Sequence, residues 1–135
     1  MNQKQRILLR GKYGGKCAYC GCELPKRWHA DHMVPILRIN KYERVVINGV
    51  TKLKTISTGK CEKPHLDTME NLVPACPSCN NKKSSMELET FRTFLQESAT
   101  RLAERDSRFR MAVKFGLVTV NEPKVRFWFE KFKGE

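Results

Sequence analysis

The sequence lacks any long apolar run. No hydrophobic stretch approaches the roughly 18 residues that a membrane-spanning helix needs. Residues 1–10 also lack the apolar segment and the small-residue cleavage site of a secretory leader. No internal repeat, low-complexity tract or flexible linker divides the 135 residues, so we expect one domain over residues 1–135. Together these absences predict a cytoplasmic protein with no membrane partner.

Acidic residues are scarce. The chain has 14 Asp and Glu against 26 Lys and Arg, which gives a formal net charge of +12. The excess is strongest before Cys61, where 13 basic residues stand against three acids. Such a charge favours a polyanionic partner, because cationic side chains release counterions from phosphates. A solvated surface that keeps the protein soluble would carry the same charge, so charge alone does not name the partner.

The first half of the chain predicts a helix, a strand and a hairpin. Residues 3–12 have the pattern of a short helix, which Gly14 and Gly15 would end. Residues 28–34 are typical of a short strand. Residues 44–56 predict a hairpin, because apolar residues flank an Asn-Gly dipeptide that suits a type I′ turn.

The second half predicts mainly helices. A short helix is expected over residues 77–84. Ser84 and Glu87 form a capping-box signature before a longer packing helix. The apolar positions of that helix are Leu88, Phe91, Leu95, Ala99 and Leu102. A weaker helical pattern covers residues 107–115, and alternation over residues 125–129 predicts a terminal hairpin. The predicted fold class is therefore α+β, with an N-terminal helix, an inserted hairpin, and C-terminal helices plus a hairpin.

Two Cys-x-x-Cys pairs carry the strongest signal for a metal. Cys17 and Cys20 form one pair, and Cys76 and Cys79 form the other. The reducing cytosol disfavours structural disulfides, whereas four thiolates in tetrahedral array close a structural Zn²⁺ site. Sites of this kind contribute roughly 10–16 kcal/mol in peptides, which is comparable to the stability of a whole domain. The alternatives are four reduced thiols in a core, or a redox pair.

Two further cysteines remain. We expect Cys22 and Cys61 to be spare buried thiols. Cys22 competing with Cys20 for the metal, or Cys61 forming a minor site with His65, stays open.

A second group of residues has the donors that a hydrolytic nuclease needs: Asp31, His32, Asn71 and Asn80. Such an enzyme requires a base for water, a cation on the scissile phosphate and a scaffold that fixes both. Each residue alone is weak evidence. An Asp-His pair is often a structural ion pair, and Asn80 would also suit a helix cap.

Three motifs together resemble a known family. They are Cys-Ala-Tyr-Cys-Gly at 17–21, Ala-Asp-His-Met-Val-Pro at 30–35, and Glu-Asn-Leu-Val-Pro-Ala-Cys-Pro-Ser-Cys-Asn-Asn-Lys-Lys at 70–83. This combination resembles the His-Asn-His (HNH) endonucleases, which have a ββα-metal (His-Me finger) core. The resemblance covers about residues 16–85. The remaining extension, about residues 86–135, looks like the tails of phage and prophage members.

The resemblance implies a metal-dependent endonuclease that hydrolyses DNA phosphodiester bonds, by nicking or by double-strand cleavage. It implies that His32 is the general base, that Asp31 and Asn80 bind the catalytic cation, and that Asn71 braces the loop that aims His32. Many members have histidine where this chain has Asn80. An amide oxygen is a harder ligand than imidazole nitrogen, so we expect Mg²⁺ or Mn²⁺ at the catalytic site.

The resemblance also implies that Lys82 and Lys83 face DNA phosphate. His32 and Asn71 are 39 residues apart, which leaves room for the predicted hairpin. That insert either contacts DNA or only packs. A regular strand points Asp31 and His32 to opposite faces, so the strand must end, twist or bulge there.

Aromatic and histidine neighbours of these motifs have two interpretations each. We expect His29 to be exposed near phosphate, and the alternative is a partner or third ligand at the cation site. We expect Trp28 to be a core residue rather than a platform for a base, and the same holds for Phe127, Trp128 and Phe129.

Two rival functions account for part of the sequence. A non-catalytic zinc module that binds nucleic acid would explain the four cysteines and the charge. An assembly protein, for example a component of phage DNA packaging, would keep the fold for docking and use its C-terminal helices as an interface. A nuclease that needs a packaging or restriction partner is a further alternative. The zinc module leaves the group of Asp31, His32, Asn71 and Asn80 unexplained.

Overall fold

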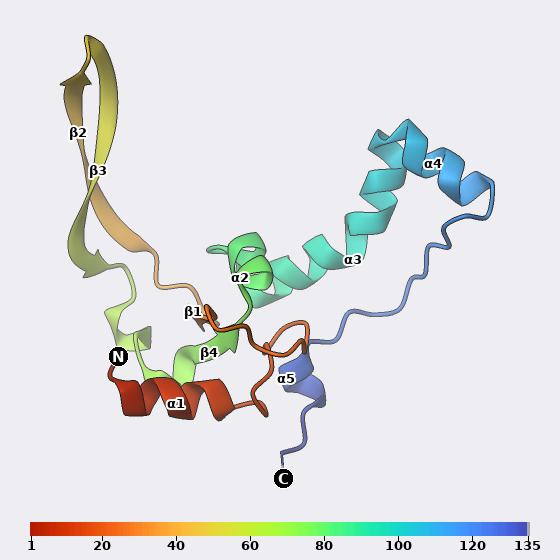
Figure 1. Ribbon diagram of the computed structural model, residues 1–135, viewed down its shortest axis with the longest axis horizontal. Helices are drawn as coiled ribbons and strands as arrows, with labels where there is room; N and C mark the ends of the chain where they lie inside the picture. The colour runs from red at the N-terminus through yellow and green to blue at the C-terminus, as the bar shows by residue number, and fades with distance from the viewer. Residues whose placement is uncertain (135) are drawn as a thin grey trace.

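The computed structural model describes residues 1–134 and is a mixed α+β protein (Figure 1). In chain order the elements are α1 (Gln3–Gly11), β1 (His29–His32), β2 (Arg38–Ile47), β3 (Val50–Cys61), η1 (Pro64–Leu66), η2 (Met69–Asn71), β4 (Leu72–Ala75), α2 (Pro77–Lys83), α3 (Leu88–Arg105), α4 (Ser107–Lys114) and α5 (Trp128–Lys131). Among the described residues, no helix is both long and apolar enough to cross a membrane.

A two-stranded antiparallel sheet of β1 and β4 lies at the centre. His29 pairs with Ala75 and His32 pairs with Leu72, so the whole of each short strand is matched. α2 begins directly after β4 and packs against β1. Arg6 of α1 holds the start of β1, since its guanidinium stacks 4.1 Å from the Trp28 ring centre and donates to the Trp28 carbonyl. Trp28 is buried, as predicted.

Aromatic rings from distant parts of the chain form the core beside this sheet. Phe91 of α3 stacks on Phe127, with ring centres 5.6 Å apart. Tyr19 lies edge-on to both rings. All three side chains are buried. The segment after α4 therefore returns to the core, and residues 119–127 connect α4 to α5 without regular structure.

The inserted hairpin is a long ribbon of β2 and β3, and within residues 1–134 these strands pair with no other strand. Asn48 and Gly49 both have positive φ (52° and 77°), which confirms the predicted type I′ turn. The strands continue well beyond the predicted residues 44–56. Their register shifts between Ile39 and Asn40, and such a bulge bends and twists a strand.

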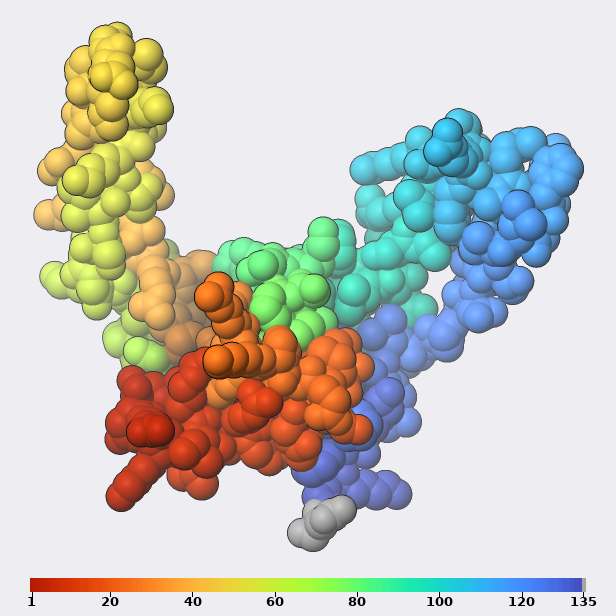
Figure 2. All heavy atoms as spheres, viewed as in Figure 1, coloured from red at the N-terminus to blue at the C-terminus, as the bar shows by residue number. Residues whose placement is uncertain are grey.

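The ribbon and the α3–α4 arm rise from the same face of the molecule. In Figures 1 and 2 the ribbon stands at the left, α3 and α4 stand at the right, and α2 lies between them. The space-filling view shows an open hollow above α2. β1 and β4 lie below α2, so the central sheet forms the base from which both projections extend.

The predicted terminal hairpin is wrong. Val125 precedes a short helix, α5, and pairs with no strand among the described residues. The Gln96 side chain supplies the missing hydrogen bonds, because it accepts from the Val125 amide at 2.7 Å and donates to the Pro123 carbonyl at 2.8 Å. A side chain on α3 thus replaces the partner strand that the alternating pattern suggested.

The predicted capping box at Ser84 and Glu87 is also wrong. Ser84 ends α2 with a positive φ of 49°, and Glu87 precedes α3 without a side-chain cap. A capping box forms instead at the start of α1, where Asn2 and Gln5 each accept the other's backbone amide. The residues between α2 and α3 therefore end α2 and give α3 no side-chain cap.

Candidate functional site

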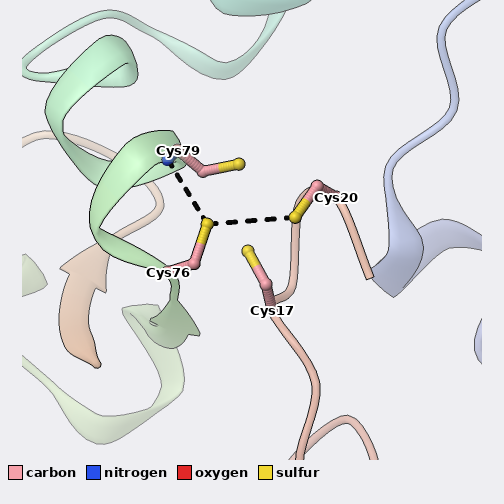
Figure 3. A group of neighbouring side chains, drawn as sticks. All are labelled: Cys17, Cys20, Cys76 and Cys79. Atoms are coloured by element: carbon pink, nitrogen blue, oxygen red, sulfur yellow. Dashed lines mark hydrogen bonds between the residues drawn. The ribbon is translucent and has the colours of Figure 1, made fainter. Parts of the chain in front are cut away.

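The four cysteines of the two Cys-x-x-Cys pairs lie together, as predicted (Figure 3). Their sulfur atoms are all within 4.8 Å of one another, and Cys20 Sγ is 3.9 Å from Cys76 Sγ. Tetrahedral Zn²⁺ with Zn–S bonds of about 2.3 Å requires sulfurs about 3.8 Å apart. The cluster therefore has the size and ligand type to hold a structural metal such as zinc.

Tight turns aim both pairs at one point. Cys76 is the N-cap of α2, and its sulfur accepts from the Cys79 amide at 3.5 Å. In the other turn, the Gly21 amide donates to the Cys17 carbonyl. Gly21 has a φ of 76°, and an added Cβ would lie 3.1 Å from the Trp128 ring. Glycine is therefore required at this position by both the backbone and the packing of α5.

The thiols differ in their ease of ionisation. The hydrogen bond from Cys79 is the largest influence on Cys17 and lowers its pKa to about 4. The same bond raises the pKa of Cys79, and burial adds to that rise. Cys17 is therefore the thiol that loses its proton more readily than Cys79, and a bound dication would favour ionisation of all its cysteine ligands. Cys22 is exposed and Cys61 is half-buried, so the expectation of a buried thiol is wrong for Cys22.

Asp31 lies in a buried polar cluster between β1 and α2. The Tyr19 hydroxyl donates to Asp31 Oδ2 at 2.5 Å, and Lys83 Nζ lies 3.3 Å from the same oxygen. Lys83 also donates to the His32 carbonyl at 3.1 Å. Burial, followed by the negative charge of Asp31, raises the pKa of Tyr19, which keeps its hydroxyl protonated as a donor.

The two lysines at the end of α2 have different surroundings. The resemblance implied that both face phosphate. Lys83 is fully buried, at 0% exposure, so the structure places it under the site instead of on its surface. Helical geometry explains the difference, because consecutive residues point about 100° apart around the axis. Lys82 is exposed, with Nζ 5.7 Å from the Phe94 ring centre, and remains a candidate for phosphate.

His32 occupies the last position of β1. Its Nε2 lies 2.8 Å from Asp67 Oδ1, and the His32 side chain is only 16% exposed. Strand alternation separates it from Asp31, whose contacts are with Tyr19 and Lys83. The strand ends here, without a bulge in its pairing with β4. This end leaves His32 at the margin of the sheet, beside the loop that precedes β4.

Asn71 fixes the backbone that follows His32. Its side-chain oxygen accepts from the Val34 amide, and its side-chain nitrogen donates to the Val34 and Leu66 carbonyls, each at 2.9 Å. Its own carbonyl accepts from the Met33 amide at 2.8 Å. These four bonds are the contacts that a residue bracing the loop after His32 would make.

Asn80 and His29 meet on the face of β1 that α2 covers. Asn80 Nδ2 lies 2.7 Å from His29 Nδ1. His29 is half-buried rather than exposed, which favours the alternative that it is a partner of the candidate cation site. With Nδ2 directed at His29, the Asn80 side-chain oxygen is the ligand atom that remains.

Sequence reasoning missed three participants: Tyr19, Asp67 and the ion pair of Lys83 with Asp31. Tyr19 lies inside the first Cys-x-x-Cys turn, so the turn that places the thiols also places its hydroxyl. Asp67 gives no comparable signal, because it is 35 residues from His32 and reaches it only through the folding of the insert. Asp67 is four residues before Asn71, within the loop that Asn71 closes through Leu66.

Comparisons with known proteins give no family for this chain. No family profile, curated protein or solved structure matches it. The functional interpretation therefore depends on the residues and their geometry.

Proposed function

We propose that the chain is a metal-dependent HNH endonuclease with a ββα-metal core, and that it hydrolyses DNA phosphodiester bonds. The observation that carries the proposal is the position of His32. It ends β1 next to Asp31, and Asn71 holds the loop after it by three side-chain hydrogen bonds. β1, β4 and α2 supply two strands and a helix in the order that such a core has.

His32 is the general base of the proposed reaction. Its Nε2 is engaged by the Asp67 carboxylate, so Nδ1 is the nitrogen that accepts a proton from water. The water attacks phosphorus in line, and the products carry 5′ phosphate and 3′ hydroxyl ends. Asp67 holds the imidazole in one orientation through its 2.8 Å contact with Nε2. Asp67 is thus a positioning residue.

Asp31 and Asn80 are the residues that would hold the catalytic cation. Both contacts to Asp31 engage Oδ2, so Oδ1 is the oxygen available to a metal. Carboxylate and amide oxygens suit Mg²⁺ or Mn²⁺, which would stabilise charge on the phosphate and on the leaving oxygen. Lys83 offsets part of the charge of Asp31, so we expect weak cation binding until DNA phosphate adds further oxygen ligands.

The test is cleavage of supercoiled plasmid by the zinc-loaded protein with added Mg²⁺ or Mn²⁺. We expect nicking in the parent protein and a loss of roughly 10²–10⁴-fold in rate for His32→Ala. His65→Ala is the matched control, because His65 is exposed on η1 and outside the site. Cutting that survives His32→Ala at the parental rate would overturn the assignment.

One observation favours the rival function, a zinc module that only binds nucleic acid. The ion pair with Lys83 and the hydrogen bond from Tyr19 occupy the same carboxylate that the catalytic cation requires. In the plasmid assay this alternative predicts DNA binding without cutting in either metal, and the same result for His32→Ala.

A further inference from the structure

The β2–β3 ribbon has both faces in solvent. Within residues 38–61 none is buried, and only Val45, Ile56, Thr58 and Cys61 are even half-buried. Ile47 and Val50 on one face are 51% and 55% exposed, and Tyr42, Val46 and Leu53 on the other face are 65%, 71% and 69% exposed. An isolated two-stranded hairpin is marginally stable in water, and apolar side chains exposed in this number mark an interaction surface. The ribbon therefore has the character of a binding element.

Positive charge dominates the ribbon. Six basic residues stand against one acid, Glu43; the basic residues are Arg38, Lys41, Arg44, Lys52, Lys54 and Lys60. Alternate residues of a strand share a face, and residues paired across two strands lie on the same face. Lys41 pairs with Ile56, Glu43 with Lys54 and Val45 with Lys52, so Lys41, Lys52 and Lys54 lie on one face. Lys41 is on β2 and the other two are on β3. The lysine face, defined as Lys41, Lys52 and Lys54, thus carries cations on both edges.

The root of the ribbon is fixed beside His32. Asn71 joins Val34, which precedes the ribbon, to Leu66, which follows it. The Glu62 amide donates to the Ile36 and Leu37 carbonyls, each at 3.0 Å, and so holds the two strands together where they leave the core. A polyanion bound along the ribbon would therefore pass close to the end of β1.

We propose that the ribbon is an arm that binds duplex DNA in its major groove, with the lysine face toward the DNA. The B-form major groove is about 12 Å wide and accepts a two-stranded ribbon. Lys41 and the pair Lys52 and Lys54 then reach phosphates on opposite walls of the groove. The deep, narrow major groove of duplex RNA does not accept a ribbon, so the arm discriminates between the two duplexes. The arm binds DNA whether or not His32 cuts it.

The experiment compares two triple variants in DNA binding. One is Lys41→Gln, Lys52→Gln, Lys54→Gln; the control is Arg105→Gln, Arg108→Gln, Lys114→Gln, which removes the same charge from exposed positions of the α3–α4 arm. The zinc-loaded full chain is titrated into a fluorescent duplex of about 30 base pairs at several salt concentrations, without Mg²⁺ or Mn²⁺. Zinc content and circular dichroism establish that all proteins are folded.

We expect the ribbon variant to bind at least roughly tenfold more weakly. The slope of log K against log salt should fall by about 2.7, because each phosphate that a lysine neutralises accounts for about 0.9 of that slope. The control should keep the parental slope. Equal weakening of binding in both variants would overturn the proposal, since the charge would then act without regard to position. If the parent protein bound duplex RNA as tightly as duplex DNA, and the ribbon variant lost affinity for both to the same extent, the major-groove geometry would be overturned.

Nuclease activity and arm function can fail independently. If no metal supports cutting but the ribbon variant alone binds DNA more weakly, the arm stands and the nuclease proposal fails. If the ribbon variant retains both parental affinity and His32-dependent nicking, the arm fails and the nuclease proposal stands. A change of oligomeric state in the ribbon variant without a change in DNA affinity would mean that the ribbon binds a second copy of the chain, and would also overturn the proposal.

Discussion

The core and the ribbon differ in where their charged and apolar side chains lie. In the core, the buried lysine is paired with a carboxylate and the aromatic rings stack on one another. In the ribbon, six basic residues stand against a single acid, and Tyr42, Val46 and Leu53 are exposed. The core pairs its buried charge and packs its rings internally, whereas the ribbon leaves its lysines on one face and Tyr42, Val46 and Leu53 on the other in solvent. The two regions therefore require different tests: unfolding for the core and DNA binding for the ribbon.

Removing a cysteine ligand should have the largest effect. Structural zinc contributes roughly 10–16 kcal/mol in peptides, and a domain's whole stability is about 5–15 kcal/mol. Cys76→Ser should therefore unfold the core and release zinc, as measured by circular dichroism and by zinc per chain. The control is Cys61→Ser, which changes a half-buried thiol at the end of β3, outside the cluster. A folded Cys76→Ser protein would mean that packing alone holds the core.

Neighbouring lysines on α2 should differ strongly in their contribution to stability. Lys83→Met leaves Asp31 buried without its cation, which we expect to lower the free energy of unfolding by about 3–5 kcal/mol. Lys82→Met changes an exposed residue and should stay within about 0.5 kcal/mol. Denaturant unfolding measures both. Equal effects would show that the buried pair is not part of what stabilises the core.

Two glycines offer the finest comparison. Gly15 in the core and Gly49 in the ribbon have φ of 75° and 77°, with open space where a Cβ would lie. Alanine costs roughly 1–2 kcal/mol in such a conformation. Gly15→Ala should lower the global free energy of unfolding by that amount. Gly49→Ala should leave it unchanged and instead speed hydrogen exchange near the turn. A global effect from Gly49→Ala would mean that the ribbon and the core unfold as one unit.

Features set by local chemistry could be predicted from the sequence. The Asn48-Gly49 turn depends on two positive φ angles, which few residues adopt readily. The four cysteines gather because a Cys-x-x-Cys turn presents two thiols to one point, and two such turns complete a tetrahedron. The bracing contacts of Asn71 fit the role that the motif resemblance implied.

Features set by distant parts of the chain could not be predicted. The pattern around Val125 is that of a strand, and only the arrival of Gln96 from α3 removes the need for a partner strand. The sequence alone suggests that Lys83 is a surface cation. Only the packing of α2 on β1 brings it next to Asp31. The contact of Asp67 with His32 requires the whole insert to fold back, and its sequence separation of 35 leaves no periodic signal.

The contacts of Phe127 and Trp128 with the core can form only after the last part of the chain has been synthesised. The Trp128 indole donates to the Tyr13 carbonyl across 115 positions of the chain, and Phe127 stacks on Phe91 beside it. All four cysteines of the cluster have been made by residue 79, but Phe127 comes 48 residues later. At about 5–20 residues per second, the ribosome needs roughly 2–10 s for that interval. During those seconds Tyr19 and Phe91 lack the ring that packs against them in the finished fold, so the aromatic core can close only when the end of the chain has emerged.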